Sequence, residues 1–271
     1  MPASLPGAER PLNTDFASAP SGLMANKVPA VTAVFWIIKV LSTTVGETGA
    51  DYLAVHVGLG TATTGAIMAT LLAGALVLQM RVRRYVPWIY WLCVVLVSIV
   101  GTQITDALTD GLEVSLYAST AAFAVALATI FALWYASERT LSIHTIVTSR
   151  RETFYWAAIL FTFALGTAAG DLATEALGLG FRLGVLAFGG LIGLVALAHR
   201  FGLGAITSFW MAYILTRPLG ASLGDLLSQS RPNGGLGLGT STTSLVFLAV
   251  IVVLVGLESV RRSRLRPRPA L

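Results

Sequence analysis

The chain has 271 residues, of which 55% are hydrophobic and only 11% are charged, and its mean hydropathy is +0.78. This balance excludes an ordinary soluble globular domain and is typical of a polytopic membrane protein. The net charge of +5 comes largely from bases that flank apolar segments, so it indicates membrane topology and not affinity for nucleic acid. The single cysteine, Cys93, excludes an intrachain disulfide and a multi-cysteine metal site.

Eight apolar runs follow one another along the chain. Each is close to the length of about 20 residues that a helix needs to cross a bilayer. The runs cover about residues 29–50, 61–79, 86–107, 117–136, 154–174, 183–198, 204–227 and 242–258. We therefore predict an all-α polytopic membrane protein with eight transmembrane helices.

One skeleton recurs in every odd-numbered run. It consists of an aromatic residue and a tryptophan, a glycine ten residues after the tryptophan, and an aspartate five residues after the glycine. The copies are Phe35, Trp36, Gly46 and Asp51; Tyr90, Trp91, Gly101 and Asp106; Tyr155, Trp156, Gly166 and Asp171; and Phe209, Trp210, Gly220 and Asp225. Identical spacing in segments otherwise made of aliphatic residues indicates internal duplication.

The repeat unit spans two helices, so every copy crosses the membrane in the same direction. This predicts four parallel two-helix repeats around a pseudo-symmetric axis, within a transmembrane domain of residues 28–260. The repeats cover about residues 28–80, 85–138, 150–200 and 203–260. Equivalent helices then converge on one axis, and equivalent aspartates lie at one depth.

Basic residues gather in the connections on one side of the predicted membrane, which places both termini in the cytoplasm. Residues 1–27 lack a cationic start that leads into an apolar core, so we expect a disordered cytoplasmic tail and no secretory signal. Residues 261–271 form a basic cytoplasmic tail, which can contact anionic lipid.

With these repeats in place, the chain resembles a family of bacterial integral membrane proteins built from four tandem two-helix repeats of unknown function, each marked by a tryptophan. The resemblance rests on the four tryptophans, on the glycines and aspartates that follow them, and on the segments 45–51 and 165–171. It covers about residues 28–260. It implies the fold and a bacterial inner-membrane location, but no activity, so the function must be argued from the residues.

Polar residues precede each repeat aspartate at intervals of four, which places them on one helix face. In the first repeat this stripe is about 18 Å long. The stripes contain Lys39, Thr43, Glu47 and Asp51; Ser98, Thr102 and Asp106; Thr167 and Asp171; and Arg217 and Asp225. Ionisable groups within a bilayer usually face a bundle interior or an aqueous cavity, and they are candidates for function.

If the four helices converge, Asp51, Asp106, Asp171, Asp225 and Glu47 outnumber the bases Lys39 and Arg217 by three charges. Hard divalent cations prefer such oxygen ligands, so we predict these five acids as ligands of a transported metal ion. We expect Thr43, Ser98, Thr102 and Thr167 to support the site, and Lys39 and Arg217 to act as gates or counter-charges. Crowded carboxylates also favour proton binding, which suits exchange of protons for the metal.

We therefore predict an inner-membrane secondary transporter, a proton-coupled exporter of a hard divalent cation with Mn²⁺ favoured, without a cofactor. One alternative is transport of a small organic or cationic solute. Another is a membrane scaffold or sensor whose acids hold the bundle together. Each aspartate also lies deep enough in its run to face water at the outer interface without a role. No nucleotide-binding loop or catalytic pair is evident, so we do not expect an enzyme. The sequence leaves the oligomeric state open.

Overall fold

The computed structural model describes residues 25–264 and confirms the all-α fold with eight long helices. The predicted tails at 1–27 and 261–271 therefore lie largely outside the described residues. The helices are α1 Ala33–Asp51, α2 Gly60–Arg81, α3 Pro87–Asp106, α4 Leu116–Glu138, α5 Ser149–Asp171, α6 Gly180–Arg200, α7 Ala205–Ser228 and α8 Thr240–Arg264. Short π-helical segments η1 Tyr52–His56, η2 Ala107–Gly111 and η4 Leu172–Ala176 follow α1, α3 and α5, and the 3₁₀ turns η3 Ile143–Thr145 and η5 Arg231–Asn233 lie in connections.

The predicted helix boundaries agree with the structure to within a few residues, except that α5 begins earlier than predicted, at Ser149, and α8 ends later, at Arg264. Several helices begin at sequence signals for an N-terminus, because the side chains of Thr32, Ser115 and Thr148 accept hydrogen bonds from free backbone N–H groups of α1, α4 and α5. Helix α3 instead begins with Pro87. Helix α8 continues to Arg264, so the start of the predicted basic tail is helical.

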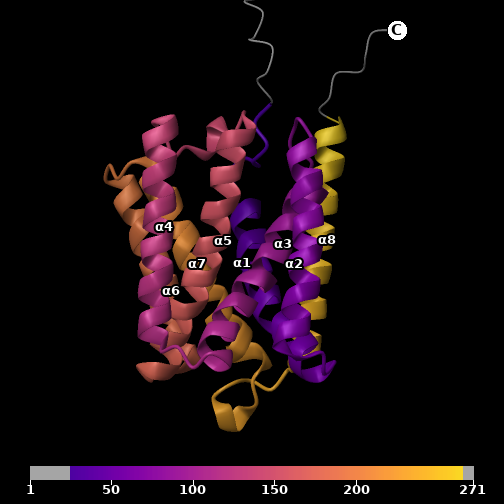
Figure 1. Ribbon diagram of the computed structural model, residues 1–271, viewed down its shortest axis with the longest axis vertical. Helices are drawn as coiled ribbons and strands as arrows, with labels where there is room; N and C mark the ends of the chain where they lie inside the picture. Colours follow the sequence, from indigo (N-terminus) through magenta and orange to yellow (C-terminus); the bar gives the residue numbers. More distant parts are fainter. Residues whose placement is uncertain (1–24, 265–271) are drawn as a thin grey trace, which may run out of the picture.

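The four odd-numbered helices form a closed inner ring. Helix α1 packs against α3 and α7, and α5 packs against the same two helices. In Figure 1, α4 and α6 lie on one side of the bundle and α2 and α8 on the other, with the inner helices between them. The convergence of the repeats on one axis is thus confirmed.

Each even-numbered helix packs mainly against the first helix of the next repeat and not against its own sequence partner. Helix α2 packs on α3, α4 on α5, and α6 on α7, while α8 completes the cycle by packing on α1. The two-helix sequence repeat is therefore not a tightly packed hairpin. This exchange ties every repeat to its neighbour, and it joins the last repeat to the first.

The repeated glycines are the points of closest contact in the inner ring. An added Cβ atom at any of them would overlap the residue three positions before the glycine of the following repeat. These contacts are Gly46 with Ser98, Gly101 with Phe163, Gly166 with Arg217, and Gly220 with Thr43. One contact rule thus operates around the whole ring, and it requires the absence of a side chain.

The aromatic–tryptophan pairs form a second closed cycle, near the start of the inner helices. The first aromatic residue of each pair contacts both its own tryptophan and a tryptophan of the next repeat. The contacts between repeats are Phe35 to Trp91 at 5.6 Å, Tyr90 to Trp156 at 5.5 Å, Tyr155 to Trp210 at 6.3 Å and Phe209 to Trp36 at 5.7 Å between ring centroids. These eight side chains, which we call the aromatic cycle, fill the bundle at this depth.

The outer helices present apolar side chains to their surroundings, as lipid contact requires. Examples are Leu71 in α2, Val125 in α4, Leu186 in α6 and Val253 in α8, which are all exposed. Within the described chain, six helices are long and apolar enough to cross a membrane, and they are α2, α3, α4, α5, α6 and α8. Helices α1 and α7 fall outside this set and complete the inner ring with α3 and α5. The protein is thus a multi-pass membrane protein.

The two ends of the bundle differ in chemistry. Helix α1 begins and α8 ends at the same end of the bundle (Figure 1), which we call the terminal face. The inner helices reach their aspartates at the opposite end, which we call the acidic face, and the α7–α8 connection also lies there.

The glycine contacts predict a position-specific effect of one methyl group. We expect Gly220→Ala to lower the melting temperature by several degrees, because forcing an atom between α7 and α1 costs about 1–3 kcal/mol. Gly49→Ala is the matched control, since a Cβ atom at Gly49 meets nothing within 4 Å. Thermal unfolding of the purified proteins in one detergent measures both. Equal stability of the two variants would contradict the close-contact role of Gly220.

Candidate functional site

An ion pair lies on the axis of the inner ring. The Arg217 guanidinium of α7 donates a 2.7 Å hydrogen bond to the Glu47 carboxylate of α1 and another to the Thr102 hydroxyl of α3. The Arg217 side chain also fills the space left by Gly166 of α5. Arg217 is fully buried and Glu47 is 8% exposed. One side chain of α7 therefore contacts the other three inner helices.

The repeat aspartates surround this ion pair on the side of the acidic face. Asp51, Asp106 and Asp171 are the last residues of α1, α3 and α5, and Asp225 lies near the end of α7. All four are close enough to Glu47 and Arg217 to interact with them electrostatically. The aspartates are partly buried and not freely exposed, with Asp225 at 9%. The structure thus brings the predicted acids around one axis.

Two further acids extend this arrangement toward the surface. Asp110 in η2 and Glu175 in η4 lie four residues after Asp106 and Asp171, and they interact electrostatically with the other carboxylates. Our sequence interpretation placed them in connections. They continue the four-residue spacing of the polar stripes, so extending the stripes beyond the repeat aspartates would have found them. The acidic mouth, as we name it, consists of Glu47, Asp51, Asp106, Asp110, Asp171, Glu175 and Asp225.

The helix geometry changes where the acidic mouth begins. In three repeats the α-helix ends at the repeat aspartate and continues as a five-residue π-helical segment. π-Helical segments are rare in proteins, and many of those that occur lie at functional sites. Helix α7 differs, because it stays α-helical past Asp225 to Ser228. Helix α7 also contains Pro218, directly after Arg217.

Lys39 lies deeper along the axis and interacts with aromatic rings. Its ammonium group is 4.0 Å from the ring centroid of Phe163 and 4.3 Å from that of Tyr213. The side chain is 1% exposed, and its Nζ atom has no hydrogen-bond partner in the described chain. Lys39 is therefore a buried amine that packs against two ring faces and has no acidic partner within the part of the chain that the structure describes.

The four supporting polar residues lie on the buried sides of the inner helices. The Thr43 hydroxyl donates to the Thr216 carbonyl of α7 at 3.3 Å, and Thr102 accepts from Arg217. Thr167 donates to a carbonyl of its own helix. The Ser98 hydroxyl lies against Gly46 without a hydrogen-bond partner among residues 25–264. Thr43 and Thr102 thus connect helices, whereas Ser98 and Thr167 line the interior.

Within the described residues, no three His, Cys, Asp or Glu side chains come close enough together to hold a metal ion. The five predicted metal ligands therefore do not form a compact cluster in this conformation. Arg217 forms an ion pair with one of them, Glu47, and the others are distributed around the axis. Their assignment as metal ligands stays a prediction.

A second buried ion pair lies at the terminal face. The sequence interpretation missed it. Lys27, which precedes α1, donates to Glu152 in the first turn of α5. Gln79 of α2 donates to the same carboxylate at 3.0 Å. Lys27 and Glu152 are almost fully buried. In the sequence, Lys27 is one of several bases that flank the apolar runs, so it indicates only which side of the membrane it lies on. No spacing in the sequence pairs it with Glu152.

Comparison with known proteins identifies the chain's family. A family model described as Repeat of Unknown Function (DUF347) matches residues 34–85, 89–140, 154–202 and 208–263. The chain belongs to this family. The four matches correspond to the four predicted repeats. Neither the curated proteins nor the solved structures include a match to the chain.

The axial ion pair predicts a strong energetic coupling. We expect Arg217→Met alone to destabilise the protein by about 3–5 kcal/mol, because it leaves Glu47 buried and unpaired. Combining it with Glu47→Gln should cost less than the sum of the two single changes. Unfolding of both single variants and the double variant measures this coupling. Strictly additive losses would show that the two side chains do not stabilise each other.

Proposed function

We propose that the protein is a secondary transporter of cations, and that it exports a hard divalent cation, with Mn²⁺ favoured, in exchange for protons. We further propose that it acts in the bacterial inner membrane with both termini in the cytoplasm, and that it is not an enzyme. The observation that carries the proposal is the acidic mouth arranged around the Arg217–Glu47 pair on the axis of a closed helical ring.

The charge distribution favours a cation over an anion or a neutral solute. The acidic mouth contributes seven carboxylates, Arg217 alone pairs with one of them, and Lys39 lies deeper against aromatic rings. Carboxylate oxygens are ligands for hard divalent cations. Among these, Mg²⁺ gives up its water reluctantly. A pathway in which carboxylates replace water therefore suits Mn²⁺ better.

Arg217 supplies a mechanism for exchange. In this conformation its guanidinium takes the place of a mobile cation beside Glu47. A divalent cation that arrives from the cytoplasmic half of the axis competes with Arg217 for that carboxylate and leaves through the acidic mouth. Protons that enter through the mouth then bind to neighbouring acids and neutralise the site. Passage also requires the cytoplasmic half of the axis to open. In this conformation the aromatic cycle fills that half of the inner ring, and the Lys27–Glu152 pair joins the segment before α1 to α5.

The scaffold or sensor alternative also has an observation in its favour. The Arg217–Glu47 pair and the Thr102 contact connect three inner helices, so these polar residues are also structural. A scaffold needs the ion pair for stability but has no need for Asp171, which makes no ion pair within the described chain. Removing the charge of Asp171 therefore separates the two classes of function. Transport of an organic cation is a further outcome of the same measurement.

The transport proposal predicts a selective change in cellular metal content. We expect bacteria that express the wild-type protein to contain less Mn than bacteria that express Asp171→Asn at equal abundance. Removing one carboxylate from a cation site costs about 1.5–3 kcal/mol, which corresponds to a loss of roughly tenfold or more in transport at low substrate concentration. Elemental analysis across Mn, Fe, Mg, Ca, Co, Ni and Zn measures the effect.

Glu113→Gln is the matched control, because Glu113 is an exposed acid in the connection after η2. It should behave like the wild type. If all metals are unchanged in every strain while the variants remain folded, the divalent-cation proposal is wrong. A loss of protein abundance with Asp171→Asn would favour the scaffold instead.

The orientation proposal predicts which connections face the outside of the cell. In a Cys93→Ala background, Leu112→Cys on the acidic face should react with a membrane-impermeant maleimide in intact cells, whereas Phe201→Cys on the terminal face should react only after permeabilisation. Both positions are well exposed, at 70% and 84%. The reverse labelling pattern would place the acidic mouth in the cytoplasm and would overturn the direction of transport proposed above.

A further inference from the structure

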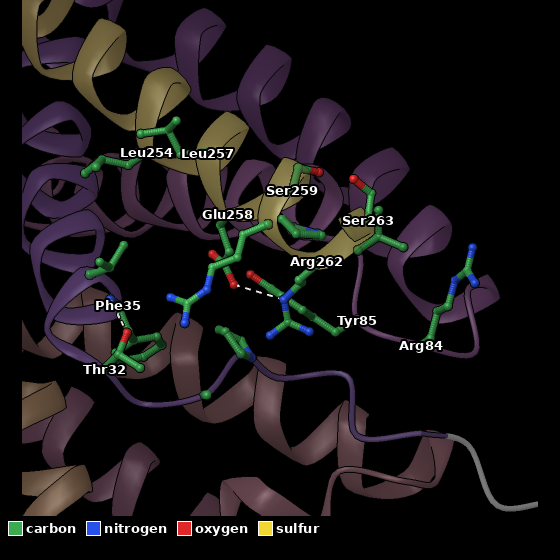
Figure 2. Close-up of a pocket in the computed structure, with 16 residues that line it drawn as sticks. Thr32, Phe35, Arg84, Tyr85, Leu254, Leu257, Glu258, Ser259, Arg262 and Ser263 are labelled. Carbon is green, nitrogen blue, oxygen red and sulfur yellow. Dashed lines mark hydrogen bonds and ion pairs between the residues drawn. The ribbon is translucent and has the colours of Figure 1, made fainter. Parts of the chain in front are cut away.

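A groove lies at the terminal face, where the end of the chain's last helix meets the start of the first. It has a volume of about 840 Å³. Its walls come from the start of α1, the α2–α3 connection and the last turns of α8 (Figure 2). At the other three junctions between repeats, a segment of chain joins the end of the even-numbered helix to the start of the next odd-numbered helix. Within residues 25–264, the groove therefore marks the one junction in the cycle that no connection between helices joins.

Basic side chains dominate the upper part of this groove. Arg84, Arg261 and Arg262 line it, and Glu258 is its one acidic lining residue. Glu258 accepts a 3.3 Å hydrogen bond from Arg262, as Figure 2 shows. Arg84 and Arg261 make no ion pair within residues 25–264. Two positive charges thus remain available for a ligand.

The third arginine of the groove, Arg262, is held in place by an aromatic side chain. The Arg262 guanidinium lies 4.3 Å from the ring centroid of Tyr85. Burial, and next the charge of Glu258, raises the pKa of the Tyr85 phenol, so its hydroxyl stays protonated. The basic wall therefore has a fixed geometry at its centre, with more exposed arginines on either side.

The lower wall of the groove is apolar and continues onto the lipid-facing surface. Val34 of α1 and Leu257 of α8 both line the groove, and they are 40% and 62% exposed. Trp88 at the start of α3 is also exposed, and it lies beside Gly256 of α8. Exposed tryptophans at helix ends are typical of the membrane interface. A ligand here meets positive charge above and hydrocarbon below.

We propose that this groove binds an anionic phospholipid, with its phosphate headgroup on Arg84 and Arg261 and its acyl chains along Val34 and Leu257. Free phosphate shares the headgroup chemistry but has no use for the apolar wall. A bound lipid contacts both the first and the last repeat, so it strengthens the junction where α8 packs on α1. This role is independent of which cation the protein transports.

The experiment uses the purified full-length protein after removal of native lipid. Binding of phosphatidylglycerol and phosphatidylcholine is measured by native mass spectrometry, and thermal stability is measured with each lipid or with inorganic phosphate. We expect phosphatidylglycerol to bind about tenfold more tightly than phosphatidylcholine and to raise the melting temperature, because each base near a bilayer surface contributes about 1 kcal/mol toward an anionic lipid. Inorganic phosphate should have little effect.

The double variant Arg84→Gln, Arg261→Gln should lose this headgroup preference. Both side chains are exposed, so the variant is expected to fold, which its melting temperature without lipid verifies. The matched control is Arg182→Gln, Arg231→Gln, which removes two arginines from a smaller groove formed by α6 and the α7–α8 connection. The control should keep the preference. Equal losses in both double variants, no headgroup preference in the wild type, or equal stabilisation by inorganic phosphate would each overturn the proposal.

Discussion

The buried ion pair between Arg217 and Glu47 imposes a constraint on which the inner ring depends. A charge inside a bilayer protein needs a partner, and breaking such a pair leaves an uncompensated charge in a poorly solvating interior. The pair therefore fixes the register of α7 against α1, and the Thr102 contact extends this register to α3. Gly166 leaves space for the arginine side chain on α5. The glycine cycle and the ion pair thus require the same helix spacing.

The four repeats share a backbone plan but differ in the side chains that reach the axis. Eight residues before the repeat aspartates lie Thr43, Ser98, Phe163 and Arg217. One layer of the ring therefore contains two hydroxyls, an aromatic ring and a cation. A site with four identical ligand sets would treat all directions around the axis equally. This layer instead gives the axis a defined polar side and a defined apolar side.

Much of the architecture could be predicted from spacing, because duplicated residues at one register must take equivalent places. The apolar runs were enough to predict the eight helices, and the Trp–Gly–Asp skeleton was enough to predict that the four odd-numbered helices converge. It was not enough for the exchange of outer helices between repeats, since α2 has the same apolar composition whichever neighbour it packs on. The partners of Lys39 and Lys27 were equally hidden. Cation–π contacts and ion pairs between distant segments depend on packing, which a helical period does not describe.

The exchange of outer helices also bears on how such a chain can arise. A lone repeat has no packing partner for its second helix, so it is complete only in the company of other copies. Four separate copies arranged in this cycle would place the end of each chain beside the start of the next, where the connections Val82–Val86, Arg139–Thr148 and Phe201–Gly204 now run. Gene fusion then needs only short joins. Within residues 25–264, the junction between α8 and α1 is the one place in the cycle where packing alone, without a connection, holds neighbouring repeats together.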